Sequence, residues 1–177
     1  MSEIVIGMDA KRIVRNSTGL GNYGRTLVND LVAKCPDDWR LLLYAPDQGR
    51  DDLRSKLLSS PKLSFAYSRA SSGLQRSFWR IGKGIVRDMQ HDGVQLYHGL
   101  TGELPRGLQR AGTKGVVTIH DLIFLRHPEY YHWLDVKLYA WKFRNALREA
   151  DRIIAISECT KRDIMELGGV SAEKIDL

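Results

Sequence analysis

The clearest indication of the fold is a short apolar segment that ends abruptly in two titratable residues. Residues 116–119, with the sequence VVTI, are β-branched, and they lie between Gly115 and the pair His120 and Asp121. Such a run is typical of a strand that is buried on both faces. In an open parallel sheet, ligands bind just beyond the carboxyl ends of the strands. The sequence therefore predicts that His120 and Asp121 lie at the rim of a cleft.

Other apolar segments of strand length alternate with segments of helical periodicity. Strands are expected at residues 4–8, 39–45, 63–67, 94–97 and 151–156. Helices are expected at residues 25–34, 76–90, 133–148 and 158–167, the last one capped by Ser157. This alternation predicts a Rossmann-like, doubly wound parallel α/β sheet with helices on both faces.

Composition restricts the class of protein and its partners. The 177 residues suffice for one domain. A net charge of +6 suits an anionic partner such as a nucleotide phosphate, a phospholipid surface or nucleic acid, but it selects none of them. No run of Lys and Arg resembles a nucleic-acid-binding tail. Cys35 and Cys159 have no metal-binding spacing, and no apolar run approaches the ~20 residues of a membrane span. We therefore expect a cytoplasmic protein that binds no nucleic acid.

A glycine motif precedes the first long helix. Gly19, Gly21 and Gly24 match the pattern G-x-G-x-x-G, in which backbone N–H groups can approach a pyrophosphate. A dinucleotide site of an NAD(P)-dependent oxidoreductase is one interpretation. However, the motif does not follow the first strand directly, and the second strand lacks the acidic residue that would hold a ribose. We favour a glycine loop that lines a different ligand, and a plain turn is the third alternative.

Two histidines follow predicted strands and therefore point to the same edge of the sheet. His120 and Asp121 could form a catalytic pair, a metal site or a structural hydrogen bond. A metal site is disfavoured because no other His has a suitable spacing. His98 precedes Gly99 at the end of another strand, and it could equally bond to a loop carbonyl group. We favour a functional role for His120.

Two further segments allow either a functional or a structural interpretation. The predicted helix 76–90 carries Arg76, Arg80, Lys83 and Arg87 opposite an apolar stripe. It could form a membrane-surface or protein-binding module, but a crossover helix with its charges in water is favoured. Ser157 and Thr160 open a later helix, where they could contact an anion or only cap the helix.

Several motifs occur in an order that resembles a known family. They are Gly19-x-Gly21-x-Tyr23-x-Arg25, Tyr97-His98-Gly99 with Leu104-Pro105, Thr118-Ile119-His120-Asp121-Leu122, His127-Pro128-Glu129-Tyr130-Tyr131, and residues 150–157 (ADRIIAIS) with Thr160-Lys161-Arg162-Asp163. The chain resembles the N-terminal domain of group 1, or family 4, retaining glycosyltransferases of the GT-B fold. Among these it is most similar to bacterial mannosyltransferase-like members.

This resemblance implies that residues 1–177 form an acceptor-binding domain and that a C-terminal donor-binding domain is absent from this chain. The full-length enzyme would transfer a hexose, mannose by resemblance, from a GDP- or UDP-hexose to a glycan or lipid-linked saccharide with retention. Such an enzyme would serve polysaccharide biosynthesis in the cytoplasm or at the inner face of the membrane. The chain alone is expected to be inactive.

The resemblance also assigns roles to individual residues. Gly19 and Gly21 would approach the donor, and His120 would lie beside the transferred sugar. Asp121 would orient the loop that carries His120. Tyr23 and His98 would border the acceptor pocket. The family requires no metal and no cofactor, so none is expected here.

Overall fold

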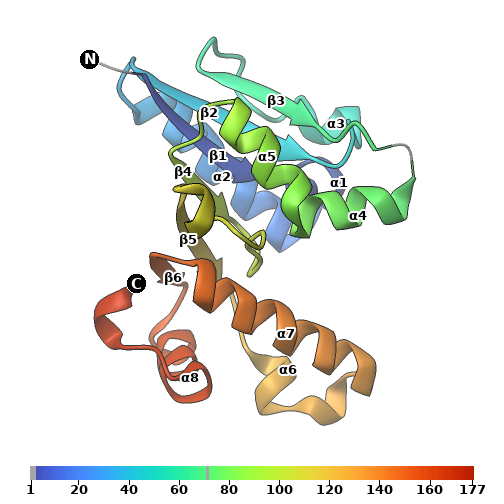
Figure 1. The fold of residues 1–177 in the computed structure, drawn as a ribbon, viewed down its shortest axis with the longest axis vertical. Coiled ribbons are helices and arrows are strands. Elements are labelled where there is room, and N and C mark those ends of the chain that lie inside the picture. Colours follow the sequence, from blue (N-terminus) through green and yellow to red (C-terminus); the bar gives the residue numbers. More distant parts are fainter. Residues whose placement is uncertain (1–2, 71) are drawn as a thin grey trace.

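In the computed structural model, which describes residues 3–70 and 72–177, the described strands form one seven-stranded parallel sheet of order β3-β2-β1-β4-β5-β6-β7 (Figure 1). The strands are β1 (Ile4–Asp9), β2 (Trp39–Ala45), β3 (Leu63–Tyr67), β4 (Leu96–Gly99), β5 (Lys114–Ile119), β6 (Arg152–Ala155) and β7 (Ile175–Asp176). The apolar segments predicted to be strands all lie in this sheet.

Helices cover both faces of the sheet. They are α1 (Lys11–Arg15), α2 (Gly19–Lys34), α3 (Asp51–Arg54), α4 (Gly73–Ile81), α5 (Lys83–His91), α6 (Ile123–Arg126), α7 (Trp133–Glu149) and α8 (Glu158–Gly168). In Figure 1, α5 and α7 lie in front of the sheet and α2 lies behind it. The predicted Rossmann-like, doubly wound parallel α/β fold with helices on both faces is confirmed.

The buried side chains form two cores, one on each face of the sheet. One core joins β1 and β2 to α1 and α2 through residues such as Met8, Ile13 and Val28. The other joins the sheet to α5, α7 and α8 through residues such as Met89 and Phe143. The alternation of β-strand side chains between the two faces produces both layers from the same strands.

The strand order places a crevice at the middle of the sheet. The chain winds outward from β1 to β3 in one direction and from β4 to β7 in the other, so β1 and β4 are neighbours at the switch point. Their carboxyl ends carry Asp9 and Gly99, next to the end of β5 at Ile119. Ligand sites of open α/β sheets lie in this position.

One expectation about the first crossover is wrong. After β1 the chain forms the short helix α1, and the glycine motif follows it. The glycine motif was expected to be a loop, but Gly19, Gly21 and Gly24 all lie in the first two turns of α2. The absence of side chains at this motif allows α1 and α2 to pack closely, which periodicity alone does not reveal.

The predicted helix 76–90 is also wrong as a single helix. Gly82 has an extended backbone, with φ −118° and ψ −161°, and it separates α4 from α5. A Cβ atom at Gly82 would lie 2.7 Å from the carbonyl oxygen of Phe78, so this position favours glycine. The break turns the chain and changes which of its basic residues face water.

The connection from β4 to β5 differs from the other long crossovers. Between Leu100 and Thr113 the chain forms a loop with a single 3₁₀ turn, Gln109–Ala111, and no α-helix. The neighbouring crossovers place α5 and α7 on this face of the sheet. The helix layer is therefore interrupted between α5 and α7.

Of the described helices, none is both long and apolar enough to cross a bilayer.

Candidate functional site

A pocket of about 230 Å³ opens at the carboxyl edge of the sheet, beside the ends of β4 and β5. His120 and Asp121 line it, as the sequence predicted. The remaining wall comes from α1, the start of α2, the loop after β4, α6, the segment that follows α6, and α7. It includes the polar or aromatic side chains of Arg12, Glu103, Tyr131, Tyr139 and Lys142. The pocket thus combines a histidine with several hydrogen-bonding groups and aromatic rings, which is a composition suited to a sugar.

His120 is held in one orientation by contacts on several sides. Its Nε2 lies 2.9 Å from the carbonyl oxygen of Leu100, and the ring meets Tyr23 edge-to-face at 4.9 Å between centroids. A carbonyl oxygen only accepts hydrogen bonds, so Nε2 carries a proton and donates it. In the neutral ring Nδ1 is then the acceptor, and it has no hydrogen-bond partner among the described residues. His120 can therefore accept a hydroxyl proton at Nδ1, or donate one there when protonated.

Tyr23 and His98 meet at a third side chain, Thr118 of β5. The Tyr23 hydroxyl lies 3.0 Å from Thr118 Oγ1, and His98 Nε2 lies 2.9 Å from the same atom. His98 is only 8% exposed, and burial lowers its pKa to about 4. His98 is therefore neutral near pH 7. Neither Tyr23 nor His98 is part of the pocket wall; Tyr23 supports the His120 ring, and His98 supports Thr118 from within the sheet.

Asp121 lies in the exposed part of the pocket rim. Its Oδ1 accepts a hydrogen bond from the backbone N–H of Ile123 at 3.2 Å. This bond closes the turn between β5 and α6. The role of Asp121 in orienting the loop that carries His120 stays a prediction.

Gly19 and Gly21 differ sharply in their surroundings. A Cβ atom on Gly21 would lie 1.9 Å from the carbonyl oxygen of Asn16, whereas a Cβ atom on Gly19 would meet nothing within 4 Å. Gly24 packs against Ile13 of α1 in a similar way to Gly21, with 2.9 Å to Cγ1. Gly21 and Gly24 thus permit helix packing, and only Gly19 is free to face a ligand. This geometry does not support a dinucleotide-binding loop.

Arg25 fixes the same junction from inside. Its guanidinium group donates to the carbonyl oxygens of Ile13 at 2.7 Å and Asn16 at 2.9 Å, and to Asn22 Oδ1 at 2.6 Å. The residue is 4% exposed. Arg25 therefore satisfies the last carbonyl groups of α1 and holds the N-terminus of α2 at the edge of the sheet.

Ser157 and Thr160 connect α8 to the same edge. Ser157 Oγ accepts the backbone N–H of Thr160 at 3.1 Å, so Ser157 is the N-cap of α8. Thr160 Oγ1 donates to the carbonyl oxygen of His120 at 3.1 Å. Both hydroxyl groups therefore have structural partners, as expected of residues that cap a helix. An anion contact at this position stays a prediction.

Sequence reasoning missed a buried ionic cluster beside the pocket. Arg80 was expected to face water, but it is 8% exposed and pairs with Glu103 and, at 3.6 Å, with Asp9. Lys142 Nζ lies 2.8 Å from the other oxygen of Glu103. Burial alone would raise the pKa of Glu103, but Arg80 and Lys142 lower it below its usual value. The break at Gly82, which no periodicity revealed, allows α4 to turn Arg80 inward.

The carboxylates of this cluster do not form a metal site. Among residues 3–70 and 72–177, no three His, Cys, Asp or Glu side chains are grouped closely enough to hold a metal ion. Glu103 and Asp9 are instead engaged with cationic side chains. The chemistry that the pocket offers is therefore hydrogen bonding, proton transfer at His120 and electrostatic stabilisation by Arg12 and Lys142.

Comparison with known proteins places this geometry in context. The family model described as Glycosyltransferase Family 4 matches residues 17–177. The solved structure of lipopolysaccharide outer core galactosyltransferase WaaB in its apo form is similar, with a TM-score of 0.52 and 12% identity over 98% of this chain and 44% of that one. This chain therefore spans less than half the length of that structure. A search among curated proteins gave no match.

Two further structures show weaker similarity. A Thermobaculum terrenum O-GlcNAc transferase mutant has a TM-score of 0.41 and 13% identity over 99% of this chain and 44% of that one. A short chain dehydrogenase family protein from Francisella tularensis has a TM-score of 0.45 and 10% identity over 97% of this chain and 79% of that one.

Proposed function

Since this chain belongs to Glycosyltransferase Family 4, we propose that it forms the acceptor-side half of a retaining hexosyltransferase. The donor is a nucleotide-sugar, with GDP-mannose as the first candidate and UDP-hexoses as the next. The acceptor is a glycan or a lipid-linked saccharide. A C-terminal donor-binding domain of the full-length protein closes the cleft from the other side, so this chain alone is inactive.

The observation that carries the proposal is the placement of His120. It lies at the carboxyl edge of the sheet, lines the pocket and keeps Nδ1 free, while Leu100 and Tyr23 fix its ring. A preorganised group of this kind can bind a hydroxyl of the transferred sugar and stabilise the charge that develops there. We assign it that role, with Asp121 orienting its loop.

Transfer passes through an oxocarbenium-like state while negative charge grows on the leaving phosphate. Three carboxylates lie in or beside the pocket among the described residues, and all three have partners: Asp9 and Glu103 are held in ion pairs, and Asp121 bonds to the backbone. We propose attack on the same face of the sugar, assisted by the leaving phosphate. Of Gly19 and Gly21, only Gly19 has open space where a side chain would lie. We therefore retain Gly19 as the contact to the donor.

The proposal places the enzyme in the cytoplasm, at the inner face of the membrane where a lipid-linked acceptor is found. It involves no cofactor and no metal, since nothing in the proposed reaction at His120 requires one. The reaction is expected to proceed undiminished when a chelator is added.

The full-length protein tests this function directly. Purified enzyme is given GDP-mannose or a UDP-hexose with saccharide acceptors, and the product anomer is determined by NMR. We expect transfer from a nucleotide-sugar with the anomeric configuration retained. An inverted product would refute retention. Binding of a nicotinamide dinucleotide, without turnover of any nucleotide-sugar, would instead support the oxidoreductase alternative.

A further inference from the structure

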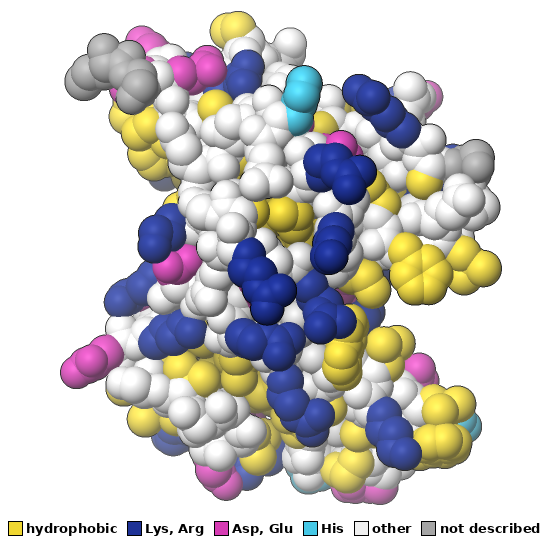
Figure 2. Space-filling view, viewed as in Figure 1, with side chains coloured by type: hydrophobic (Ala, Val, Ile, Leu, Met, Phe, Trp, Pro, Cys, Tyr) yellow, Lys and Arg dark blue, Asp and Glu magenta, His cyan; other side chains and the backbone are white. Residues whose placement is uncertain are grey.

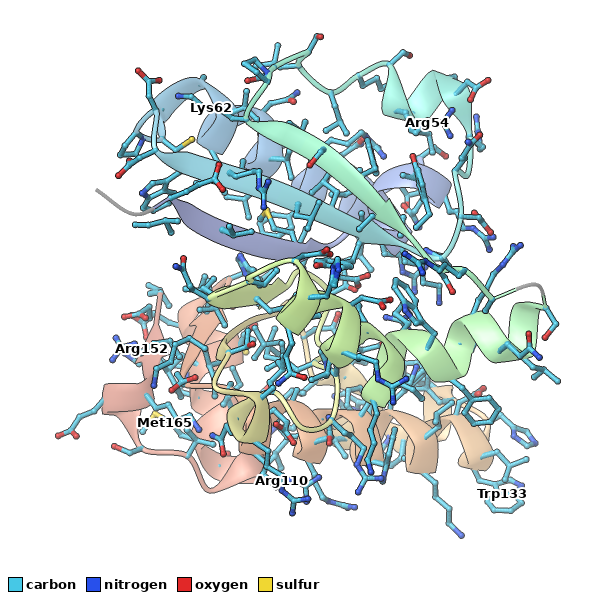
Figure 3. All side chains as sticks on the ribbon, turned by 45° about the horizontal axis from the view of Figure 1, so that its top comes forward. Arg54, Lys62, Arg110, Trp133, Arg152 and Met165 are labelled. Carbon is cyan, nitrogen blue, oxygen red and sulfur yellow. The ribbon has the colours of Figure 1, made fainter. Side chains whose placement is uncertain are left out.

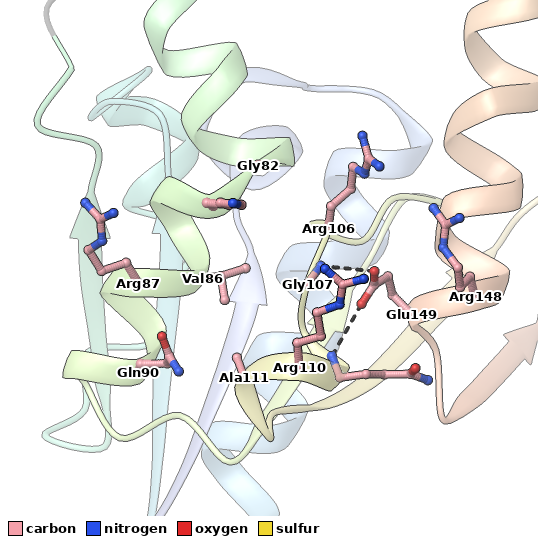
Figure 4. Close-up of a pocket in the computed structure, with 12 residues that line it drawn as sticks. Gly82, Val86, Arg87, Gln90, Arg106, Gly107, Arg110, Ala111, Arg148 and Glu149 are labelled. Atoms are coloured by element: carbon pink, nitrogen blue, oxygen red, sulfur yellow. Dashed lines mark hydrogen bonds between the residues drawn. The ribbon is translucent and has the colours of Figure 1, made fainter.

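A large basic groove lies on the face of the sheet that α5 and α7 cover, and its lining shares no residue with that of the His120 pocket. It has a volume of about 820 Å³ and runs between α5 and the end of α7, across the loop that joins β4 to β5 (Figure 4). It exists because this crossover has no α-helix to fill the space between α5 and α7. The groove is lined by Lys83 and Arg87 of α5, Arg106 and Arg110 of the loop, and Arg148 of α7.

These cations are poorly neutralised by the protein itself. Within the described ranges 3–70 and 72–177, Lys83, Arg87 and Arg110 have no hydrogen bond or ion pair. The acidic residue that lines the groove, Glu149, is 8% exposed, and its carboxylate accepts the backbone N–H groups of Gly107 at 3.0 Å and Gln109 at 3.3 Å. Its negative charge is therefore turned toward the backbone, and the groove remains strongly positive.

Other arginines of this chain show that such isolation is not the general pattern. Arg126 bridges Asp163 and Glu166, and Arg152 pairs with Asp176. The groove instead collects like charges, whose mutual repulsion a bound anion would relieve. Figure 2 shows Lys and Arg side chains gathered across the middle of this face.

Exposed apolar side chains flank the groove on α7. Leu134, Leu138 and Trp141 repeat at helical spacing on one stripe of α7, and they are 53%, 46% and 38% exposed. The guanidinium group of Arg106 lies over the Trp141 ring, 5.8 Å from its centroid, so this stripe borders the basic groove. Trp133 projects from the first turn of the same helix (Figure 3).

A second apolar stripe lies on α4. Leu74 and Phe78 are one helical turn apart and are 76% and 69% exposed. Helix α4 ends at Ile81, whose carbonyl oxygen accepts the backbone N–H of Arg106 at 3.1 Å, and the adjoining Gly82 lines the groove. The C-terminal end of α4 thus adjoins the groove, and Figure 2 shows hydrophobic side chains at the margin of this face.

We propose that this face docks on an anionic phospholipid bilayer. Lipid phosphates occupy the groove, and the stripes of α4 and α7 enter the interfacial layer beneath the headgroups. Tryptophan beside unpaired cations is suited to that layer, where one side of the ring meets lipid and the other meets water. A nucleic acid would match the charges but leaves the leucines of both stripes in water. The inference does not depend on sugar transfer.

Co-sedimentation of this chain with vesicles tests the proposal. We expect binding to phosphatidylcholine vesicles that contain phosphatidylglycerol, and weak binding to vesicles of phosphatidylcholine alone. The variant Arg87→Gln/Arg110→Gln should bind the anionic vesicles at least about tenfold more weakly, because two favourable charges are removed from the surface. The control Lys34→Gln/Lys56→Gln removes the same charge elsewhere and should bind like the wild type.

Two further measurements complete the test. Leu74→Ser/Phe78→Ser should weaken vesicle binding while circular dichroism stays unchanged, since both side chains are exposed. Binding of an acidic peptide or a single-stranded oligonucleotide is measured in parallel. The proposal is overturned if anionic and neutral vesicles bind alike, if the lysine control loses as much affinity as the groove variant, or if only the peptide or oligonucleotide binds through Arg87 and Arg110.

Discussion

The His120 pocket and the basic groove differ in whether their polar side chains have bonding partners within the protein. In and beside the pocket, His120, Arg80 and Glu103 bond to other groups of the protein. In the groove, Lys83, Arg87 and Arg110 bond to none of the residues that the structure describes. The difference indicates that the pocket is organised before a ligand arrives, as the reaction site that we propose requires, whereas the groove cations remain available to the lipid phosphates that we propose.

The largest expected effect of this difference is on stability. Arg80→Met should destabilise the protein by about 3–5 kcal/mol, because it removes the cationic partner of the buried Asp9 carboxylate and leaves Glu103 paired with Lys142 alone. Arg87→Met, which removes the same charge from the groove, should change the unfolding free energy by no more than about 0.5 kcal/mol. Urea denaturation of both variants measures the contrast. Equal effects would show that the two regions do not differ in the way described.

A pH dependence of stability sharpens the same contrast. The pKa of His98 is lowered by burial to about 4, from an ordinary value of 6.5. Between these values the unfolded chain binds more protons than the folded chain, so the contribution of His98 is complete above about pH 6.5 and is lost as the pH falls toward 4. The loss amounts to about 3 kcal/mol.

Comparison with a variant isolates that contribution. Urea unfolding of the wild type and of His98→Gln is measured across the acidic range, with the exposed His91→Gln as the control. The wild type and His91→Gln should lose stability more steeply than His98→Gln. Parallel pH profiles for all the proteins would contradict the burial of a neutral His98.

A smaller effect on stability is expected in the glycine motif, where Gly21→Ala and Gly19→Ala form a matched pair. Gly21→Ala should destabilise by about 1–3 kcal/mol, because its Cβ atom would overlap the carbonyl oxygen of Asn16. Gly19→Ala should cost nothing and could add up to about 1 kcal/mol, since the position is helical and open. Thermal unfolding of the pair distinguishes helix packing from a phosphate-binding loop, in which neither substitution would alter the stability of the free protein.

Much of this fold could be predicted because its strands are short apolar runs bounded by polar residues. The run 116–119 lies within β5, and His120 and Asp121 follow it at the edge of the sheet. Parallel pairing brings consecutive strand ends together without knowledge of long-range contacts. The family resemblance rested on motifs at these same ends, and the family is now shown by the match over residues 17–177.

The errors arose where a glycine has a tertiary role. The glycine motif predicts a loop at Gly21, but Gly21 is helical and lies against the backbone at the end of α1. The pattern of helix 76–90 predicts that the helix continues through Gly82, but α4 ends there. Arg80 was placed in water for that reason, and the ion pairs with Asp9 and Glu103 could not be foreseen from spacing. The basic groove was missed because its cations come from separate parts of the chain.

The most direct test of the central claim is the rate of sugar transfer by His120→Ala in the full-length protein, compared with His91→Ala. His91 is exposed and does not line the pocket, so it controls for the loss of a histidine. We predict a fall in kcat of about 10²-fold or more for His120→Ala, with an unchanged circular dichroism spectrum, and no change for His91→Ala. Near-normal turnover by His120→Ala would contradict the assignment of this pocket as the reaction site.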